Sequence, residues 1–148
     1  MKVSEAMTRD VRVAAPDDSI REAAQLMVQL DAGVLPVAEG DRLIGMITDR
    51  DITVRAVAAG RGPETLVRDV MSAEVKYAFD DQPVEEIARN MADIQVRRLP
   101  VVNRDKRLVG ILSLGDLAGH TLAAEKAGEA LRGISRPGGD HSQSTAPV

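Results

Sequence analysis

An internal duplication limits what this chain can fold into more than any other feature of its sequence. When the sequence is shifted by 64 positions, Val3 falls on Val67, and similar residues continue to match as far as Val37 on Val101. One extra residue then enters a turn, so the shift becomes 65 and the matching continues. Such a long overlay indicates one supersecondary unit used twice. Further matched pairs are Met7 with Met71, Thr8 with Ser72, Asp17 with Asp81, Leu35 with Leu99, Gly45 with Gly110, Thr48 with Ser113, and Asp51 with Asp116.

The repeat predicts how the chain is organised. We expect a first copy at residues 1–60, a linker at 61–66 and a second copy at 67–122. A glycine and a proline mark the linker as a break between elements. Beyond the second copy we expect a helical extension at 123–132. The tail at 133–148 is rich in Gly, Ser and Pro, and we expect it to be disordered.

Each copy has the pattern of a mixed α/β (α+β) unit in the order strand, helix, strand, strand, helix. In the first copy, alternation at 10–14 predicts a short strand, and the apolar positions that follow recur at helical spacing. Residues 34–38 and 43–48 predict a hairpin, and 51–58 predict a second helix. A proline in the first hairpin strand removes a ladder donor, which predicts an edge or an interruption there. In the second copy we expect the closing helix to continue through 120–131.

Composition argues against several classes of function. The net charge of −4 argues against a nucleic-acid binder that works by neutralising phosphates. The chain has one Tyr, one Phe and no Trp, so a base-stacking platform is not expected. The absence of cysteine excludes disulfides and thiolate metal sites, and no run of about 18 apolar residues could span a membrane. We therefore expect a cytoplasmic protein that binds neither nucleic acid nor membrane.

The sequence also lacks the residues of a metal site or a catalytic centre. The two histidines, His120 and His141, are too few and too scattered to share a metal ion. A Ser-His-Asp order and a Gly-rich phosphate loop are absent, so we expect neither catalytic residues nor an enzyme. Tyr77 has two interpretations, which are contact with a flat base and ordinary packing.

One strand–helix junction in each copy carries a hydroxyl residue followed three positions later by an aspartate. These pairs are Thr48 with Asp51 and Ser113 with Asp116. A helix start offers unpaired N–H groups and a positive dipole end, which favour an anion. Arg50 adds a guanidinium that can pair with phosphate. The aspartates would repel phosphate, so they are better suited to accept hydrogen bonds from a ribose diol.

Two interpretations of the junctions remain open from the residues alone. In the first, they hold a nucleoside phosphate, and the strands that carry Pro36 and Pro100 sandwich a flat base. In the second, they are helix caps, because Asp and Thr are favoured at that position in any helix. Duplication does not decide between them, since a duplicated cap is still a cap.

The two junctions and their surroundings resemble the cystathionine-β-synthase-type domain, called the CBS domain. The resemblance rests on Leu-Pro-Val followed by Gly-x-h-Thr-x-x-Asp, where h is apolar, and it covers residues 1 to about 122. In the second copy the motif has Ser in place of Thr and Leu-Gly in place of Asp-Arg. The chain is similar to short stand-alone bacterial proteins that consist of one CBS pair. The matching segments are 3–7, 35–37 and 45–51 in the first copy, and 67–71, 99–102 and 110–116 in the second.

The resemblance implies two pseudo-symmetric CBS units packed through their sheets as a CBS pair, with two clefts for adenosine-type ligands. It implies AMP, ADP, ATP or S-adenosylmethionine as ligand, with or without magnesium, no required cofactor, and a homodimer. Asp would bind the ribose, and Thr or Ser would bind the phosphate. The arginines Arg97 and Arg98 either reach phosphate or form a solvated strand entry. The candidate ligand-binding residues are Thr48, Arg50, Asp51, Pro36 and Val37 in the first copy, and Ser113, Asp116, Pro100, Val101 and Arg98 in the second.

The sequence therefore predicts a regulatory module that senses an adenine nucleotide and signals to a protein partner that the sequence does not identify. The alternative is a protein-interaction or scaffold module whose clefts are vestigial. An enzyme that acts on a nucleotide is a weaker third hypothesis, because the carboxylates at the junctions are needed for ribose.

Overall fold

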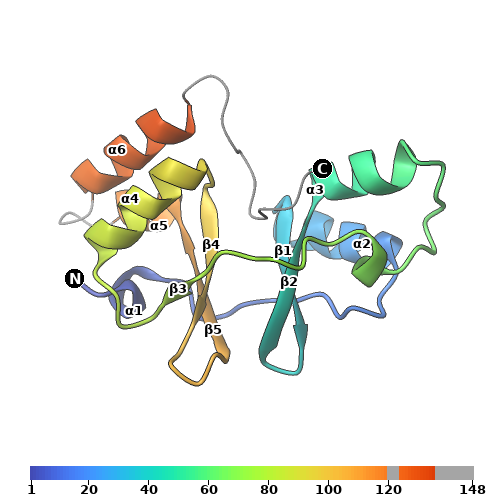
Figure 1. Ribbon diagram of the computed structural model, residues 1–148, viewed down its shortest axis with the longest axis horizontal. Helices are drawn as coiled ribbons and strands as arrows, with labels where there is room; N and C mark the ends of the chain where they lie inside the picture. Colours follow the sequence, from blue (N-terminus) through green and yellow to red (C-terminus); the bar gives the residue numbers. More distant parts are fainter. Residues whose placement is uncertain (120–123, 136–148) are drawn as a thin grey trace. The chain divides into compact units, whose positions relative to one another are not determined.

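The structure is a computed structural model that describes residues 1–119 and 124–135 (Figure 1). The chain forms two compact units. The first unit contains Arg12–Val75, and the second unit combines Met1–Val11 with the described residues that follow Val75. The units therefore differ from the sequence repeats at their ends, because the N-terminal segment belongs with the second copy.

In the first unit a helix and a hairpin form where the sequence predicts them. Helix α2 begins after Ser19, whose Oγ accepts a hydrogen bond from the Glu22 amide at 3.1 Å. The hairpin strands are antiparallel, and Val34 lies opposite Thr48. The elements are α2 (Ile20–Leu30), β1 (Val34–Glu39), β2 (Arg42–Thr48), α3 (Asp49–Asp51), the π-helix η1 (Ile52–Val57) and the 3₁₀-helix η2 (Val67–Asp69).

Two expectations about the first copy are corrected. The strand expected at 10–14 is reduced to one parallel bridge between Ala14 and Val37. In the second copy the strand continues, because the Asp80 amide donates to the Val102 carbonyl at 3.0 Å, whereas the matching Pro16 has no N–H to donate. The helix expected at 51–58 is a short α-turn followed by the π-helix η1.

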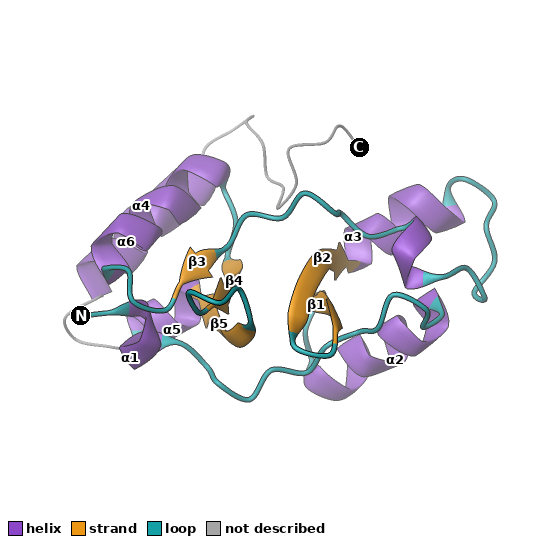
Figure 2. Ribbon diagram, turned by 60° about the horizontal axis from the view of Figure 1, so that its bottom comes forward, coloured by secondary structure: helices purple, strands orange, loops and turns teal. Residues whose placement is uncertain are grey.

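The second unit contains a three-stranded sheet in the order β3-β4-β5. Strand β3 is parallel to β4, and β4 is antiparallel to β5, with Arg98 opposite Ser113. Helices α4 and α6 lie side by side (Figures 1 and 2). The elements are α1 (Val3–Ala6), β3 (Ala78–Phe79), α4 (Val84–Ile94), β4 (Arg98–Val102), β5 (Leu108–Ser113), α5 (Leu114–Ala118) and α6 (Ala124–Ile134).

The closing helix of the second copy does not run through as expected. Helix α5 ends at Ala118, and residues 120–123, which include His120, lie outside the described residues. Helix α6 runs to Ile134 and so includes Gly133, which the sequence places in the tail. Its docking on α4 explains this, because a Cβ on Gly133 would lie 2.7 Å from that of Ala92. The rest of the expected tail, residues 136–148, lies outside the described residues.

The segment that leads into each copy packs against the other copy. Val3, Ala6 and Met7 are buried in the core of the second unit, while Val67 and Val70 are buried in the core of the first. The contact is close at two matched glycines. A Cβ on Gly110 would lie 2.6 Å from the Met7 sulfur and 2.9 Å from the Thr8 carbonyl oxygen.

A Cβ on Gly45 would lie 2.8 Å from both the Met71 sulfur and the Ser72 carbonyl oxygen. The backbone closes both contacts, since Met46 exchanges two hydrogen bonds with Ser72, as Ile111 does with Thr8. Each hairpin is therefore completed by the leading segment of the other repeat.

Candidate functional sites at two strand–helix junctions

The junction of the first unit is held by a reciprocal pair of hydrogen bonds. The Asp51 amide donates to Oγ1 of Thr48 at 2.9 Å, and the Thr48 amide donates to Oδ2 of Asp51 at 3.0 Å. This is a capping box at the start of α3. The capping interpretation of both residues is therefore correct, and any ligand must use the acceptor capacity that the cap leaves over.

The fold shifts the pKa of Asp51 at this junction. Only 8% of the residue is exposed, and burial raises the pKa of its carboxyl above the ordinary value of 3.8. The hydrogen bonds from Thr48 and the charges of Arg55 and Arg50 oppose that rise in pKa. Arg55 Nε lies 3.9 Å from Asp51 Oδ1.

Arg55 is a site residue that sequence reasoning missed. Its Nη1 donates to the carbonyls of Val70 at 3.4 Å and Met71 at 3.2 Å, which belong to the segment leading into the second copy. It thereby connects the junction carboxylate to that segment. The signal that could have found it is its position four residues after Asp51, where side chains share a helix face.

Arg50 is exposed, as a phosphate-binding residue should be, but a carboxylate lies beside it. The Arg50 amide donates a hydrogen bond to Oδ1 of Asp49 at 2.8 Å. The Asp49 amide donates to the Gly33 carbonyl at 2.9 Å, and a Cβ on Gly33 would lie 2.7 Å from Asp49 Oδ2. The charge at the first junction is therefore mixed.

The second junction repeats the capping box. The Asp116 amide donates to Oγ of Ser113 at 2.9 Å, and the Ser113 amide donates to Oδ2 of Asp116 at 3.0 Å. Thr8 adds a contact that the first junction does not share, because its hydroxyl lies 3.3 Å from Oδ1 and 3.4 Å from Oδ2 of Asp116. The leading segment thus touches the carboxylate itself.

A cavity of about 600 Å³ opens beside the second junction. Ser113 and Gly115 line it at the junction, and Arg97 and Arg98 line it at the entry to β4. Helix α6 supplies a further wall that includes Gly128 and Leu131. The structure thus brings Arg98 and Ser113 to one cavity, and it adds a helix whose role the sequence did not reveal.

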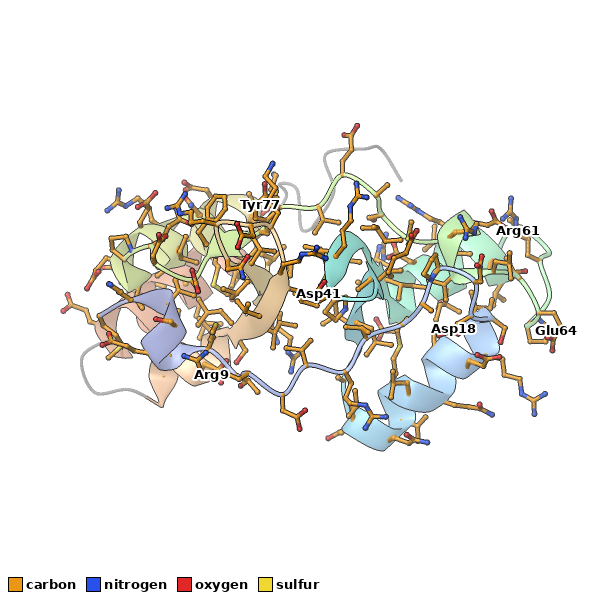
Figure 3. All side chains as sticks on the ribbon, turned by 90° about the horizontal axis from the view of Figure 1, so that it is seen from below. Arg9, Asp18, Asp41, Arg61, Glu64 and Tyr77 are labelled. Atoms are coloured by element: carbon orange, nitrogen blue, oxygen red, sulfur yellow. The ribbon has the colours of Figure 1, made fainter. Side chains whose placement is uncertain are left out.

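The remaining candidates lie deeper or elsewhere. Val37 and Val101 are fully buried in the cores of their units, and Pro36 and Pro100 are buried in β1 and β4. Tyr77, labelled in Figure 3, is 39% exposed and lines a separate cavity of about 370 Å³. Its ring also packs edge-to-face on Phe79 with centroids 5.5 Å apart.

Within residues 1–119 and 124–135, no group of three or more His, Asp or Glu side chains could hold a metal ion. None of the helices seen in these same residues is long and apolar enough to cross a membrane.

Comparison with known proteins identifies the family. The family model described as CBS domain matches twice, at residues 3–57 and 67–122. The chain belongs to the CBS domain family. This CBS pair is 44% identical over 133 residues to the CBS domain-containing protein YhcV of Bacillus subtilis, which covers 90% of this chain and 94% of that protein. The expected fold of two CBS units, each mixing helices and strands, is confirmed.

Two solved structures similar to this CBS pair contain adenosine ligands. CBSX2 in complex with AMP is 27% identical, with a TM-score of 0.73, covering 84% of this chain and 98% of that one. The CBS pair of protein MJ0100, in complex with 5-methylthioadenosine and S-adenosyl-L-methionine, is 28% identical, with a TM-score of 0.70, covering 80% and 94%. Similar CBS pairs therefore bind adenosine ligands.

Proposed function

We propose that this CBS pair is a regulatory module that binds an adenosine-type ligand at its two junctions and signals the ligand's presence to a protein partner. One observation carries the proposal. Both junctions hold a hydroxyl and an aspartate in the same geometry, and each capping box engages only Oδ2 of its aspartate. A carboxylate has about four acceptor sites, so each aspartate keeps capacity for a ribose diol.

The same proposal assigns roles to the neighbouring residues. Thr48 and Ser113 contact the phosphate, helped by Arg50 in the first unit and Arg98 in the second. Pro36 and Val37, with Pro100 and Val101, contribute backbone rather than side-chain surface to the base, since their side chains are buried. The ligand is bound without chemical conversion, which chromatography of recovered nucleotide after incubation with the protein would check. The protein acts as a homodimer, which light scattering would check.

Titration calorimetry tests the binding part of the proposal. The protein is titrated with AMP, ATP and S-adenosylmethionine, with and without magnesium, and then as the Asp51→Ala and Asp116→Ala variants. We expect micromolar binding, with each variant losing one site. Asp105→Ala, which alters an exposed aspartate in the β4–β5 turn, at the end of that hairpin opposite to the Arg98–Ser113 pair, should bind as the unaltered protein does.

A scaffold function is the second candidate, and a specific observation favours it. Both aspartates form capping boxes, and that structural role alone is sufficient to account for them. The same titration distinguishes the sensor function from the scaffold function. Absence of heat with every ligand at protein concentrations of hundreds of micromolar would reject the sensor and leave the scaffold.

A further inference from the structure

The two junctions differ in what surrounds them inside their own units. In the first unit Val34 lies opposite Thr48, and Gly33 lies against the Asp49 carboxylate. In the second unit Arg98 lies opposite Ser113. The repeat also puts Arg97 where the first copy has Gly33, and Leu114 where it has Asp49. The second junction thus gains two guanidinium groups and loses a carboxylate.

The cavity beside the second junction combines these charges with an apolar wall. Arg97 and Arg98 line one side of it, and Leu131 of α6, 45% exposed, lines another. Its volume of about 600 Å³ is within the usual range for a small-molecule site. A ligand that suits this lining has an anionic end for the arginines and a less polar body for α6.

Helix α6 is a fixed wall of this cavity. Three of its own side chains, those of Ala127, Ala130 and Ile134, are buried. Nε2 of the buried Gln95, at the end of α4, donates to the Gly133 carbonyl at 3.1 Å. Together with the close approach of Gly133 to Ala92, these contacts hold α6 against α4 (Figure 2).

We propose that α6 and Arg97 make the second junction selective for adenosine ligands that carry a phosphate, and against those that carry a sulfonium cation. The inference rests on the proposed function and deepens it. Arg97 and Arg98 attract the phosphate of AMP and repel the positive sulfur of S-adenosylmethionine. The first junction, where Arg50 lies beside Asp49, discriminates less between the two.

Gly128 provides a test that does not endanger the fold. A Cβ there meets nothing within 4 Å, so in the Gly128→Leu variant the side chain extends into the cavity. Leucine also favours helix more than glycine does, so the melting temperature should not fall. The matched control is Arg132→Leu, which places the same side chain on the same helix at an exposed position outside the cavity.

The experiment isolates the second junction by using Asp51→Ala as the background. In calorimetry, this background should bind AMP at least tenfold more tightly than S-adenosylmethionine. Adding Gly128→Leu should weaken AMP binding at least tenfold, while adding Arg132→Leu should change it less than twofold. Adding Arg97→Gly, the residue of the first copy, should reduce the preference for AMP.

The outcomes distinguish this inference from the proposed function. If the unaltered protein binds neither AMP nor S-adenosylmethionine, the proposed function fails and this inference fails with it. If binding survives only at the first junction, or if Gly128→Leu leaves AMP binding unchanged, or if both ligands bind the second junction equally, this inference alone is overturned.

Discussion

At the scale of single residues, the two aspartates perform a structural role and leave room for a binding role. Each closes a capping box through Oδ2 and keeps further acceptor capacity on its carboxylate. The fold treats them differently. Asp51 is 8% exposed and faces Arg55, whereas Asp116 is contacted by the Thr8 hydroxyl.

The variant Asp51→Ala should separate the structural from the binding role. Loss of the carboxylate removes one half of the capping box and should lower the free energy of unfolding by about 1 kcal/mol. That loss is too small to unfold a domain of ordinary stability. Urea denaturation, with Asp51→Asn as the variant that keeps an acceptor for the Thr48 amide, measures the change. A variant that is unfolded in water would show that the cap is the main role of this residue.

Burial of Asp51 predicts a specific pH dependence of stability. Because burial raises its pKa in the folded state, the stability that this carboxyl contributes is complete below about pH 3.8 and is lost as pH rises through the raised pKa. The protein should therefore lose stability relative to Asp51→Asn as pH rises through that window. Chemical denaturation of both proteins at a series of pH values measures the difference, and a difference that is independent of pH would contradict the prediction.

A close backbone contact leaves no room for a side chain at position 45, which is Gly45. A methyl group there would press on the Ser72 carbonyl oxygen and the Met71 sulfur, each 2.8 Å away. Gly45→Ala should therefore lower the free energy of unfolding by about 1–3 kcal/mol. Gly62→Ala is the matched control, because a Cβ at Gly62 meets nothing within 4 Å. Thermal unfolding of the two variants should differ clearly, and equal midpoints would disprove this requirement.

At the scale of elements, the leading segments are short but buried. Helix α1 has four residues, and Val3 within it is fully buried against the second copy. The resemblance to the family includes both segments, 3–7 and 67–71, without indicating which copy each one contacts. Periodicity reports which face of an element is buried, and it carries no information about the partner of that face.

The leading segments are exchanged, which means that each packs against the other copy. A mutation in one leading segment should therefore destabilise the other copy. Val3→Ala and Val67→Ala each remove buried methyl groups and should each cost about 2 kcal/mol. Hydrogen exchange should show faster opening in residues 78–118 for Val3→Ala, and in residues 20–57 for Val67→Ala. Faster opening in the copy that contains the mutation, rather than in the other copy, would refute the exchange.

At the scale of the whole molecule, the repeat allowed the order of elements in both copies to be predicted. The hairpins and the two hydroxyl–Asp junctions follow from local patterns. The exchange, the wall formed by α6 and the link through Arg55 depend on contacts between distant segments, which one sequence does not encode locally. The strand shortened at Pro16 lies between these two cases. The missing N–H of Pro16 can be read from the sequence, but its effect is clear only once the strand's hydrogen-bond partners are known.

The compact units predict which fragment can fold alone. Residues 12–75 contain the first copy together with Val67, Val70 and Met71, which complete it. A fragment of residues 1–60 lacks those three side chains and carries α1 without its partners. Circular dichroism on heating should show cooperative unfolding for 12–75 and none for 1–60. Val67→Ala in the 12–75 fragment should lower the midpoint temperature of its unfolding. Equal behaviour of the two fragments would contradict the division of the chain into these two units.

The exchange also has a consequence for how the chain is made. A ribosome synthesises Met1–Val11 before the sheet against which this segment packs, which ends at Ser113. The first unit is continuous, so it can close as soon as Val75 has left the exit tunnel. The N-terminal segment must wait, with its apolar side chains uncovered, until most of the chain has emerged. A segment that is synthesised early is therefore among the last to reach its folded position.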